Sequence, residues 1–162
     1  ASSPHIGAEF FAQKVGVEYT HVPYKGQGPS MVDLTAGVVD GMFDGMSSYS
    51  QVKSGQVAAV AIAAPQRHPA APEIPTFKEL GVDVVSGTWF GLLAPAGTPD
   101  AVVGKINADM RQVLKDPELQ AQIAKTGLVV STASPGDFGK FLEQEAAKLQ
   151  ALVDQGAKID LN

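Results

Sequence analysis

Short apolar runs alternate with helix signals along the whole chain, and this alternation limits the possible folds more than any other feature. The runs that resemble strands cover residues 17–22, 38–43, 57–63, 84–93 and 128–130. Glycine or proline stands at most of the changes between a strand-like run and a helical segment. Such a rhythm is typical of βαβ units, in which each helix returns the chain to the same edge of a parallel sheet. We therefore predict an α/β fold with a mostly parallel sheet.

Seven helices are expected between these runs, because capping residues and helix breakers flank them. Serine, threonine or aspartate followed by proline is a common helix start, and glycine is a common helix end. The expected starts are Ser3-Pro4, Pro29, Ser47 or Ser48, the capping box of Thr76 and Glu79, Thr98-Pro99, Asp116-Pro117 and Ser134-Pro135. The glycines expected to end six of these helices are Gly16, Gly37, Gly55, Gly81, Gly127 and Gly156.

The composition is that of an ordinary globular protein, and it excludes several kinds of site. Of the 162 residues, 44% are hydrophobic and 18% are charged, which argues against a disordered or fibrous chain. The net charge is -5 and no basic cluster is present, so we expect no nucleic acid partner. Without cysteine the chain forms no disulfide, zinc–thiolate site, iron–sulfur cluster or thiol nucleophile.

The first residues place a helix start almost at the beginning of the chain. Ala1-Ser2-Ser3-Pro4-His5 contains neither the basic segment nor the apolar core of a signal peptide. In a βα fold a strand normally precedes such a helix, and here that strand is missing. We therefore expect a truncated chain.

Catalytic motifs are nearly absent, so we predict no enzyme, no cofactor and no metal ion. No serine has the flanking glycines of a nucleophile elbow, and no Gly-Lys-Ser or Gly-Lys-Thr ends a phosphate loop. Gly26-Gln27-Gly28 lacks the third glycine of a dinucleotide-binding fingerprint. The three histidines, His5, His21 and His68, are far apart in the sequence and form no paired metal motif.

The start of the first helix offers a place for an anion. Ser2 and Ser3 supply hydroxyl groups, and the helix N-terminus supplies backbone N–H groups at its positive end. His5 lies in the same first turn. This combination can bind a carboxylate or a phosphate without a charged side chain. The alternative is that Ser3 only caps the helix and that His5 is an ordinary first-turn residue.

Two later loops follow strand-like runs and contain further candidates. Tyr24, Lys25 and Gly26 place a phenol, an ammonium group and a glycine on one rim; the alternative is a solvated lysine beside a packed tyrosine. Asp44 ends the next run and Ser47 begins a helix, for which ordinary turn and cap chemistry is the alternative. Open α/β folds bind ligands at the carboxyl ends of their strands. The loops together therefore indicate a cleft for a small anion or polar metabolite rather than a reaction centre.

Several stretches of the chain carry the pattern of one family. They are His21-Val22-Pro23-Tyr24-Lys25-Gly26, Val39-Asp40-Gly41-Met42-Phe43-Asp44, the crossover over 61–75, and Trp89-Phe90-Gly91-Leu92-Leu93-Ala94-Pro95-Ala96-Gly97-Thr98-Pro99. In these stretches, which follow one another in the family's order, the chain resembles the solute receptors of tripartite tricarboxylate transporters, also called the Bug family. The resemblance covers the whole chain.

The resemblance implies a type II periplasmic-binding fold, in which two α/β lobes close on a solute. Its members are longer, so it also implies that the signal peptide, most of lobe one and the start of lobe two are missing. Residues 1–84 are then expected to form lobe two, and residues 85–162 the crossover and the C-terminal part of lobe one. Because the truncation exposes apolar faces of residues 85–162, we expect a second copy of the chain or another fragment to cover them.

The resemblance further implies a non-enzymatic receptor in the periplasm. Such a receptor holds a small carboxylate-bearing metabolite, largely through backbone N–H groups and bridging water, and serves the membrane subunits of a transporter. Carried over to this chain, the ligand-binding residues are Ser2, Ser3, His5, Tyr24, Lys25, Gly26, Asp44 and Ser47. Two alternatives remain: an effector-sensing domain of a transcription regulator with the same two lobes, and a small hydrolase or isomerase with His5 or Asp44 as base.

Overall fold

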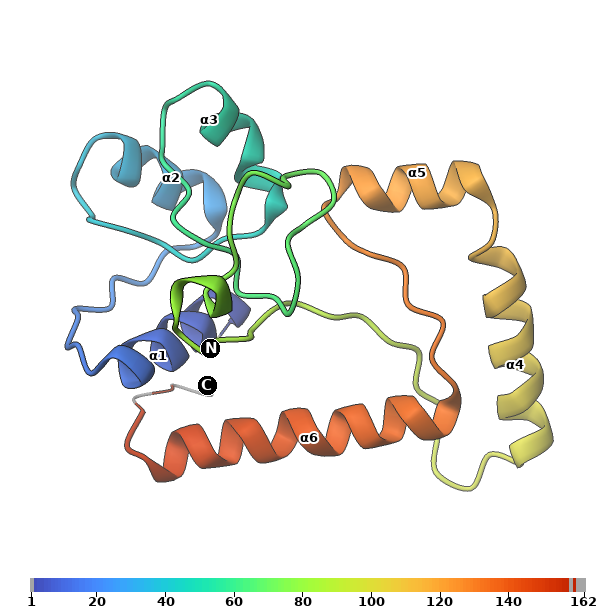
Figure 1. Cartoon of the computed structure of the whole chain (residues 1–162). Helices are drawn as coiled ribbons and strands as arrows, with labels where there is room; N and C mark the ends of the chain where they lie inside the picture. Colours follow the sequence, from blue (N-terminus) through green and yellow to red (C-terminus); the bar gives the residue numbers. More distant parts are fainter. Residues whose placement is uncertain (1, 158, 160–162) are drawn as a thin grey trace. The chain divides into compact units, whose positions relative to one another are not determined.

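The computed structural model describes residues 2–157 and 159, which fall into two compact units. Of the described residues, unit 1 contains 2–88 together with 155–157 and 159, and unit 2 contains 89–154. Figure 1 shows the helices with their labels along the chain. Each unit contains its own cluster of aromatic rings.

Helices are the regular structure of both units. Unit 1 contains α1 (Ser3–Val15), α2 (Gln27–Thr35), the 3₁₀ turn η1 (Met46–Ser48), α3 (Tyr49–Lys53) and the 3₁₀ turn η2 (Lys78–Leu80). Unit 2 contains α4 (Asp100–Val113), α5 (Pro117–Lys125) and α6 (Pro135–Asp154). In the part of the chain that the structure describes, no helix is both long enough and apolar enough to cross a membrane.

The predicted helix ends are confirmed, and the predicted starts are confirmed in part. All six glycines expected to end helices have a positive φ, the left-handed conformation that glycine adopts most readily. Asp116 caps α5, because its Oδ1 accepts hydrogen bonds from the N–H groups of Glu118 (2.7 Å) and Leu119 (3.2 Å). Ser134 Oγ likewise accepts a hydrogen bond from the Asp137 N–H at 3.1 Å.

The prediction that Ser3 caps α1 is wrong by one residue. Ser2 is the N-cap residue, with an extended backbone (φ -129°, ψ 163°) and no side-chain cap bond. Ser3 is therefore the first helical residue and Pro4 the second, a position where the missing proline N–H costs nothing. The helix ends at Gly16 as expected.

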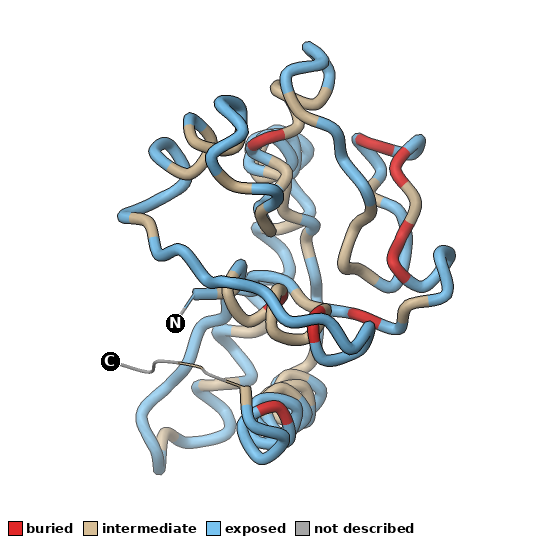
Figure 2. Tube along the Cα trace, turned by 90° about the vertical axis from the view of Figure 1, so that its left-hand side faces the viewer, coloured by how far each residue is buried: buried red, intermediate tan, exposed pale blue. Residues whose placement is uncertain are grey.

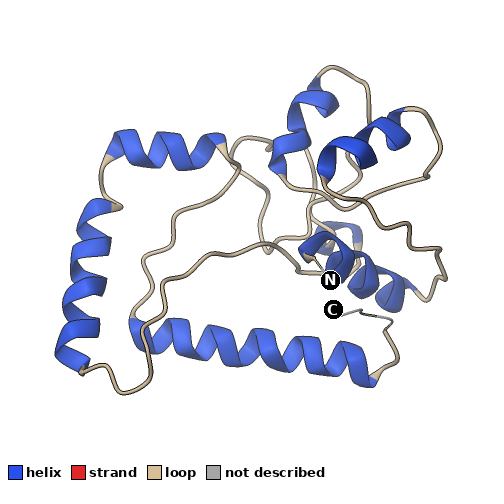
Figure 3. Cartoon of the chain, turned by 180° about the vertical axis from the view of Figure 1, so that it is seen from behind, coloured by secondary structure: helices blue, strands red, loops and turns tan. Residues whose placement is uncertain are grey.

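The predicted parallel sheet is the main correction. Among the described residues none of the five predicted strands forms a ladder, and Figure 3 shows these segments as loops. The pairing that does form there is one parallel bridge between Ile62 and Thr76. The Ile62 N–H donates to the Pro75 carbonyl at 2.8 Å, and the Phe77 N–H donates to the Ile62 carbonyl at 3.1 Å.

Beside the bridge, the Ser86 N–H donates to the Ala63 carbonyl at 3.0 Å, but among the described residues these contacts do not extend into a ladder. A parallel ladder needs two segments, distant in sequence, to lie about 4.8 Å apart. Several valines of the predicted strands are correspondingly exposed, among them Val38 (69%) and Val60 (73%). The α/β prediction is thus correct for the helices and for the extended course of the segments between them, and wrong for the sheet itself.

A capping box and an ion pair hold the crossover over 61–75 against the start of η2. The Thr76 N–H donates to Glu79 Oε2 at 2.7 Å, and the Glu79 N–H donates to Thr76 Oγ1 at 3.2 Å, so the predicted capping box is confirmed. The Arg67 guanidinium lies 2.9 Å from the Glu79 carboxylate. Its hydrogen bonds, helped by the Thr76 N–H, lower the pKa of Glu79 to about 2.

Three phenylalanine rings form the centre of unit 1. The Phe11 ring of α1 lies 5.3 Å from that of Phe77 and 6.0 Å from that of Phe43, and the latter two are 5.8 Å apart. Gly7 allows this approach, because a Cβ there would lie only 3.0 Å from Phe43 Cδ1. Buried residues otherwise occur in short, separate stretches (Figure 2).

Unit 2 has a second aromatic cluster, formed by Trp89 and two rings of α6. Trp89 meets Phe138 and Phe141 edge-on, with centroid distances of 5.9 and 5.4 Å. Gly91 lies against the same rings: a Cβ built on it would be 2.1 Å from Phe138 Cζ. The strand-like stretch therefore needs glycine at this position.

We predict that Gly91→Ala destabilises unit 2 by about 1–3 kcal/mol, because the added methyl group forces the Phe138 ring to move. Unfolding in denaturant, followed by the fluorescence of Trp89, measures the effect. Gly87→Ala is the matched control, since a Cβ there has no neighbour within 4 Å. Equal stability of the two variants would contradict the close packing at Gly91.

Candidate functional site

The start of α1 combines two hydroxyl groups with the positive end of a 13-residue helix. Ser2 is exposed and Ser3 half-buried. The first turn contains no acidic side chain that would compete with an incoming anion. The N–H groups of a first helical turn have no partner within the helix, so this end of α1 can donate hydrogen bonds to a carboxylate.

The side chain of His5, in the same turn, is largely enclosed. Its side chain is 9% exposed, and its Nε2 lies 3.6 Å from Glu9 Oε1. The imidazole ring stacks on that of His21 with a centroid distance of 3.8 Å and an angle of 6°. His5 therefore belongs to a packed group at the base of the helix start.

The contact between Phe43 and Gly7 brings a second candidate close to the first turns of α1. Asp44 directly follows Phe43, and it begins the loop that leads to η1. The side chain of the residue before Asp44 thus packs against the first turns of α1.

Gln27 ties the Asp44 loop to the start of α2. Its Nε2 donates hydrogen bonds to Asp44 Oδ2 and to Ser48 Oγ, both at 2.7 Å. Its Oε1 accepts a hydrogen bond from Ser47 Oγ at 3.3 Å. Ser48 stands at the N-cap position of α3, as predicted, but its side chain makes no cap hydrogen bond, because its Oγ donates to Asp44.

The sequence analysis did not single out Gln27, which joins the Asp44 loop to the start of α2. The signal was its place between Gly26 and Gly28, where a side chain that both donates and accepts follows a strand-like run. It links two of the three candidate segments, since Tyr24, Lys25 and Gly26 precede it directly. Lys25 and Gly26 are exposed. Gly26 has φ +122°, a conformation that residues other than glycine rarely adopt.

Tyr24 is engaged within its own loop. Its hydroxyl donates a hydrogen bond to Asp33 Oδ2 of α2 at 2.7 Å. This bond raises the pKa of Tyr24 above its ordinary value, because ionisation would remove the donated proton. The phenol thus stays neutral and holds the loop against α2.

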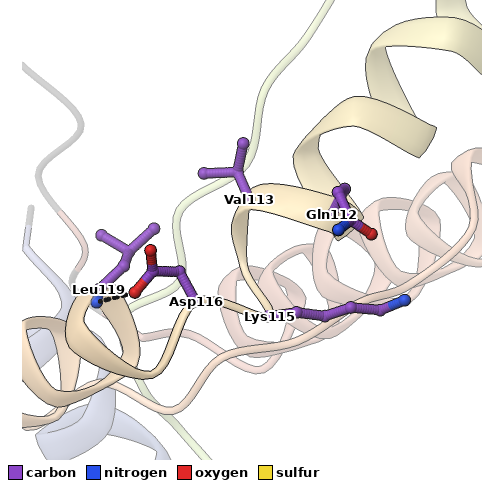
Figure 4. A pocket seen from close by; sticks show the side chains of 5 residues that line it. All are labelled: Gln112, Val113, Lys115, Asp116 and Leu119. Atoms are coloured by element: carbon purple, nitrogen blue, oxygen red, sulfur yellow. Dashed lines mark hydrogen bonds between the residues drawn. The ribbon is translucent and has the colours of Figure 1, made fainter.

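Unit 2 has a surface hollow that is separate from the candidate site residues. It has a volume of about 410 Å³ and is lined at the junction of α4 and α5 by Gln112, Val113, Lys115, Asp116 and Leu119 (Figure 4). The Asp116 carboxylate already accepts the two hydrogen bonds that cap α5. None of the eight candidate site residues lines it. Among the described residues no group of three or more His, Cys, Asp or Glu side chains is placed to hold a metal ion.

Comparison with known proteins places the chain in a family. Residues 1–157 match the family described as tripartite tricarboxylate transporter family receptor. The chain belongs to this family. Members of the receptor family are periplasmic solute-binding proteins without enzymatic activity. The resemblance predicted from the sequence is confirmed. The family match favours a receptor over the two alternatives, an enzyme and a domain of a transcription regulator.

Two curated relatives show how much of the family the chain spans. It is 30% identical to BugT of Bordetella pertussis over 161 residues, which are 98% of this chain and 49% of BugT. It is 32% identical to a Pseudomonas knackmussii protein of the clcB-clcD intergenic region, covering 94% of this chain and 92% of that protein. The chain spans about half the length of the first curated relatives it matches, at 46% and 49%.

Solved structures agree with the family assignment. A Rhodopseudomonas palustris protein, Rpa4515 with adipate, superposes with a TM-score of 0.77 at 30% identity, covering 94% of this chain and 52% of that one. MatC from Rhodopseudomonas palustris, with bound malate, gives a TM-score of 0.75 at 29% identity and covers 94% and 53%. The backbone of the chain therefore follows that of part of a periplasmic binding protein, although its described residues form no sheet.

We predict that Gln27→Glu destabilises unit 1 near pH 7, because it sets a second carboxylate against Asp44 where an amide now donates. The expected cost is about 1–3 kcal/mol. Acidification to about pH 4 should reduce it, since one of the two carboxyl groups then takes up a proton. Chemical denaturation at both pH values measures the effect.

Gln13→Glu is the matched control, because Gln13 is exposed on α1 and carries the same change of charge. If the two variants were equally stable at both pH values, Gln27 would not be the link between the two loops.

Proposed function

We propose that the chain forms the part of a periplasmic receptor that holds the carboxylate of a small metabolite, and that the complete receptor serves a tripartite tricarboxylate-type transporter. The observation that carries the proposal is the start of α1, which presents N–H groups and the Ser2 and Ser3 hydroxyls beside the Asp44 loop. Neutral donors suit an anion in a protein of net charge -5, because they act locally while distant charges are screened within about 10 Å.

The solute class we propose is a small aliphatic dicarboxylate or a related acid. Its support comes from the two similar structures, which contain adipate and malate. In this chain we assign one carboxylate to the start of α1 and to the backbone N–H groups of the 24–26 loop. Asp44 and Ser47 then limit the other end of the site: the Ser47 hydroxyl can donate to the second carboxylate of the solute, and the Asp44 carboxylate, held by Gln27, keeps that group at a distance.

The lobe assignment is a further part of the proposal. Residues 1–84 are assigned to lobe two and residues 85–162 to the crossover and the C-terminal part of lobe one. The division of the chain's own contacts between residues 88 and 89 supports a boundary in this region. The transporter's membrane subunits are the proposed partners of the complete receptor, supported by the family to which the chain belongs.

We predict that Ser3→Asp weakens the binding of adipate about tenfold. A carboxylate at this position repels an anion about 4 Å away by about 1–4 kcal/mol, while it suits the helix N-terminus and leaves α1 at least as stable. Calorimetric titration with adipate gives the affinity, and thermal unfolding gives the stability.

Ala101→Asp is the control, because it places the same charge in the first turn of α4, in unit 2, at an exposed position. Equal affinities of the two variants would contradict the site at α1. Absence of adipate binding by the unmodified chain would overturn the proposed solute class.

The exposed apolar side chains of unit 2 support self-association of the chain. They include Phe90 (78%), Leu92 (67%) and Leu93 (68%) in the strand-like stretch, with Val102, Ile106 and Met110 on α4. We propose that a second copy covers this surface, because burying it removes a large apolar area from water.

Light scattering should then give about twice the monomer mass of 16.8 kDa. The double substitution Phe90→Ser and Leu93→Ser is expected to restore the monomer. Val129→Ser, which changes an equally exposed side chain elsewhere in unit 2, should leave the dimer intact. A monomeric unmodified chain would contradict self-association.

A further inference from the structure

Two histidines that are distant in the sequence meet as a stacked pair in unit 1. The ring of His5, in the first turn of α1, lies 3.8 Å from the ring of His21 and only 6° from parallel to it. His21 lies in the extended segment 17–22, which runs from α1 to the Tyr24–Gly26 loop. The stack is therefore a direct link between the helix start and the segment that leads into the second part of the proposed site.

The groups facing the pair are Glu9 on α1 and Tyr19 on the extended segment. Glu9 Oε1 lies 3.6 Å from His5 Nε2 and accepts a hydrogen bond from the Tyr19 hydroxyl at 2.7 Å. His5 Nε2 is buried without a hydrogen-bond partner, in a side chain that is 9% exposed.

The same arrangement opposes a second proton. Two imidazolium rings at stacking distance repel each other, and Glu9 supplies only one negative charge to offset them. In agreement with this geometry, the pKa of His21 is lowered from 6.5, mainly by burial and then by His5, while Glu9 acts in the opposite direction. Tyr19 stays neutral, because burial and its bond to Glu9 raise the pKa of its phenol.

We propose that His21 is a positioning residue of the receptor, which fixes the Tyr24–Gly26 loop relative to the start of α1 by stacking on His5, and that the stack opens when both rings are protonated. The positioning part rests on the proposed function, since it presumes that both elements contact the solute. The acid-sensitive stack rests only on the four side chains of His5, Glu9, Tyr19 and His21.

The direction of the pH dependence follows from the lowered pKa of His21. A group whose pKa is lower in the folded chain binds protons more weakly there, so protonation favours the unfolded or open form. The stack therefore contributes fully above pH 6.5 and weakens as the pH falls below that value. Loss of the link should loosen segment 17–22 from α1.

The first test needs no ligand. Proton NMR of the full chain follows the imidazole Cε1–H signals between about pH 4 and pH 8.5, and the His5→Phe and Glu9→Gln variants are titrated beside the unmodified chain. We expect His5→Phe to raise the pKa of His21, because the ring stays and the charge is removed. Glu9→Gln should lower it further, because the stabilising carboxylate is lost.

These opposite shifts are the signature of the stack, and a purely structural role of His5 and Glu9 would not produce them. Shifts in the same direction, or none, would overturn the proposal. A second measurement detects the contact between the two rings in the unmodified chain. We expect nuclear Overhauser effects between the rings at about pH 8 and their loss at about pH 4.5. Their persistence at the lower pH would also overturn it.

The second test concerns binding. His21→Phe keeps an aromatic ring for stacking but cannot take up a proton, so the affinity for adipate should depend less on pH between about 7.5 and 5 than in the unmodified chain. His68→Phe is the control and should keep the original pH profile. Identical profiles for His21→Phe and the unmodified chain would contradict the positioning role. If the unmodified chain bound no adipate at any pH, the proposed function would fail, and the ligand-free titration would still decide the stack.

Discussion

The packing of three phenylalanine rings holds α1 against the segment that precedes Asp44 and against the residues that follow the Ile62–Thr76 bridge. Phe11 lies on α1, Phe43 directly precedes Asp44, and Phe77 directly follows Thr76 of the Ile62–Thr76 bridge. This cluster packs α1 directly against the segment that leads into the Asp44 loop. The hydrogen bonds of Gln27 and the stacked histidines then add the Tyr24–Gly26 loop to the same end of the unit.

Local features of the fold could be predicted from the sequence, and non-local features could not. Asp116 before Pro117 and glycines such as Gly127 determine helix ends through neighbouring atoms alone, so these predictions are confirmed. A strand depends on a partner elsewhere in the chain. Segment 57–63 has the continuous apolar composition of a strand covered on both faces, yet Val60 is 73% exposed, because the bridge formed among the described residues involves Ile62 and does not extend to Val60.

The candidate site shows the same division. Asp44 and Ser47 are candidates because they follow a strand-like run, and the structure joins both to Gln27 by hydrogen bonds. Gln27 was missed because its role depends on side chains 17 to 21 residues away. The pairing of His5 with His21 was missed for the same reason: their separation in the sequence gives no periodic signal. The family, in contrast, was recognised from motifs that keep their order along the chain, and the match over residues 1–157 confirms it.

The central claim is that the solute binds at the start of α1 and the adjoining loop of unit 1. Amide chemical-shift mapping of the isotope-labelled chain during titration with adipate tests it most directly. The account predicts the largest shifts at the N–H groups of Ser3, His5 and the Tyr24–Gly26 loop, with smaller changes around Asp44. Shifts confined to unit 2, or centred on the hollow between α4 and α5, would contradict it.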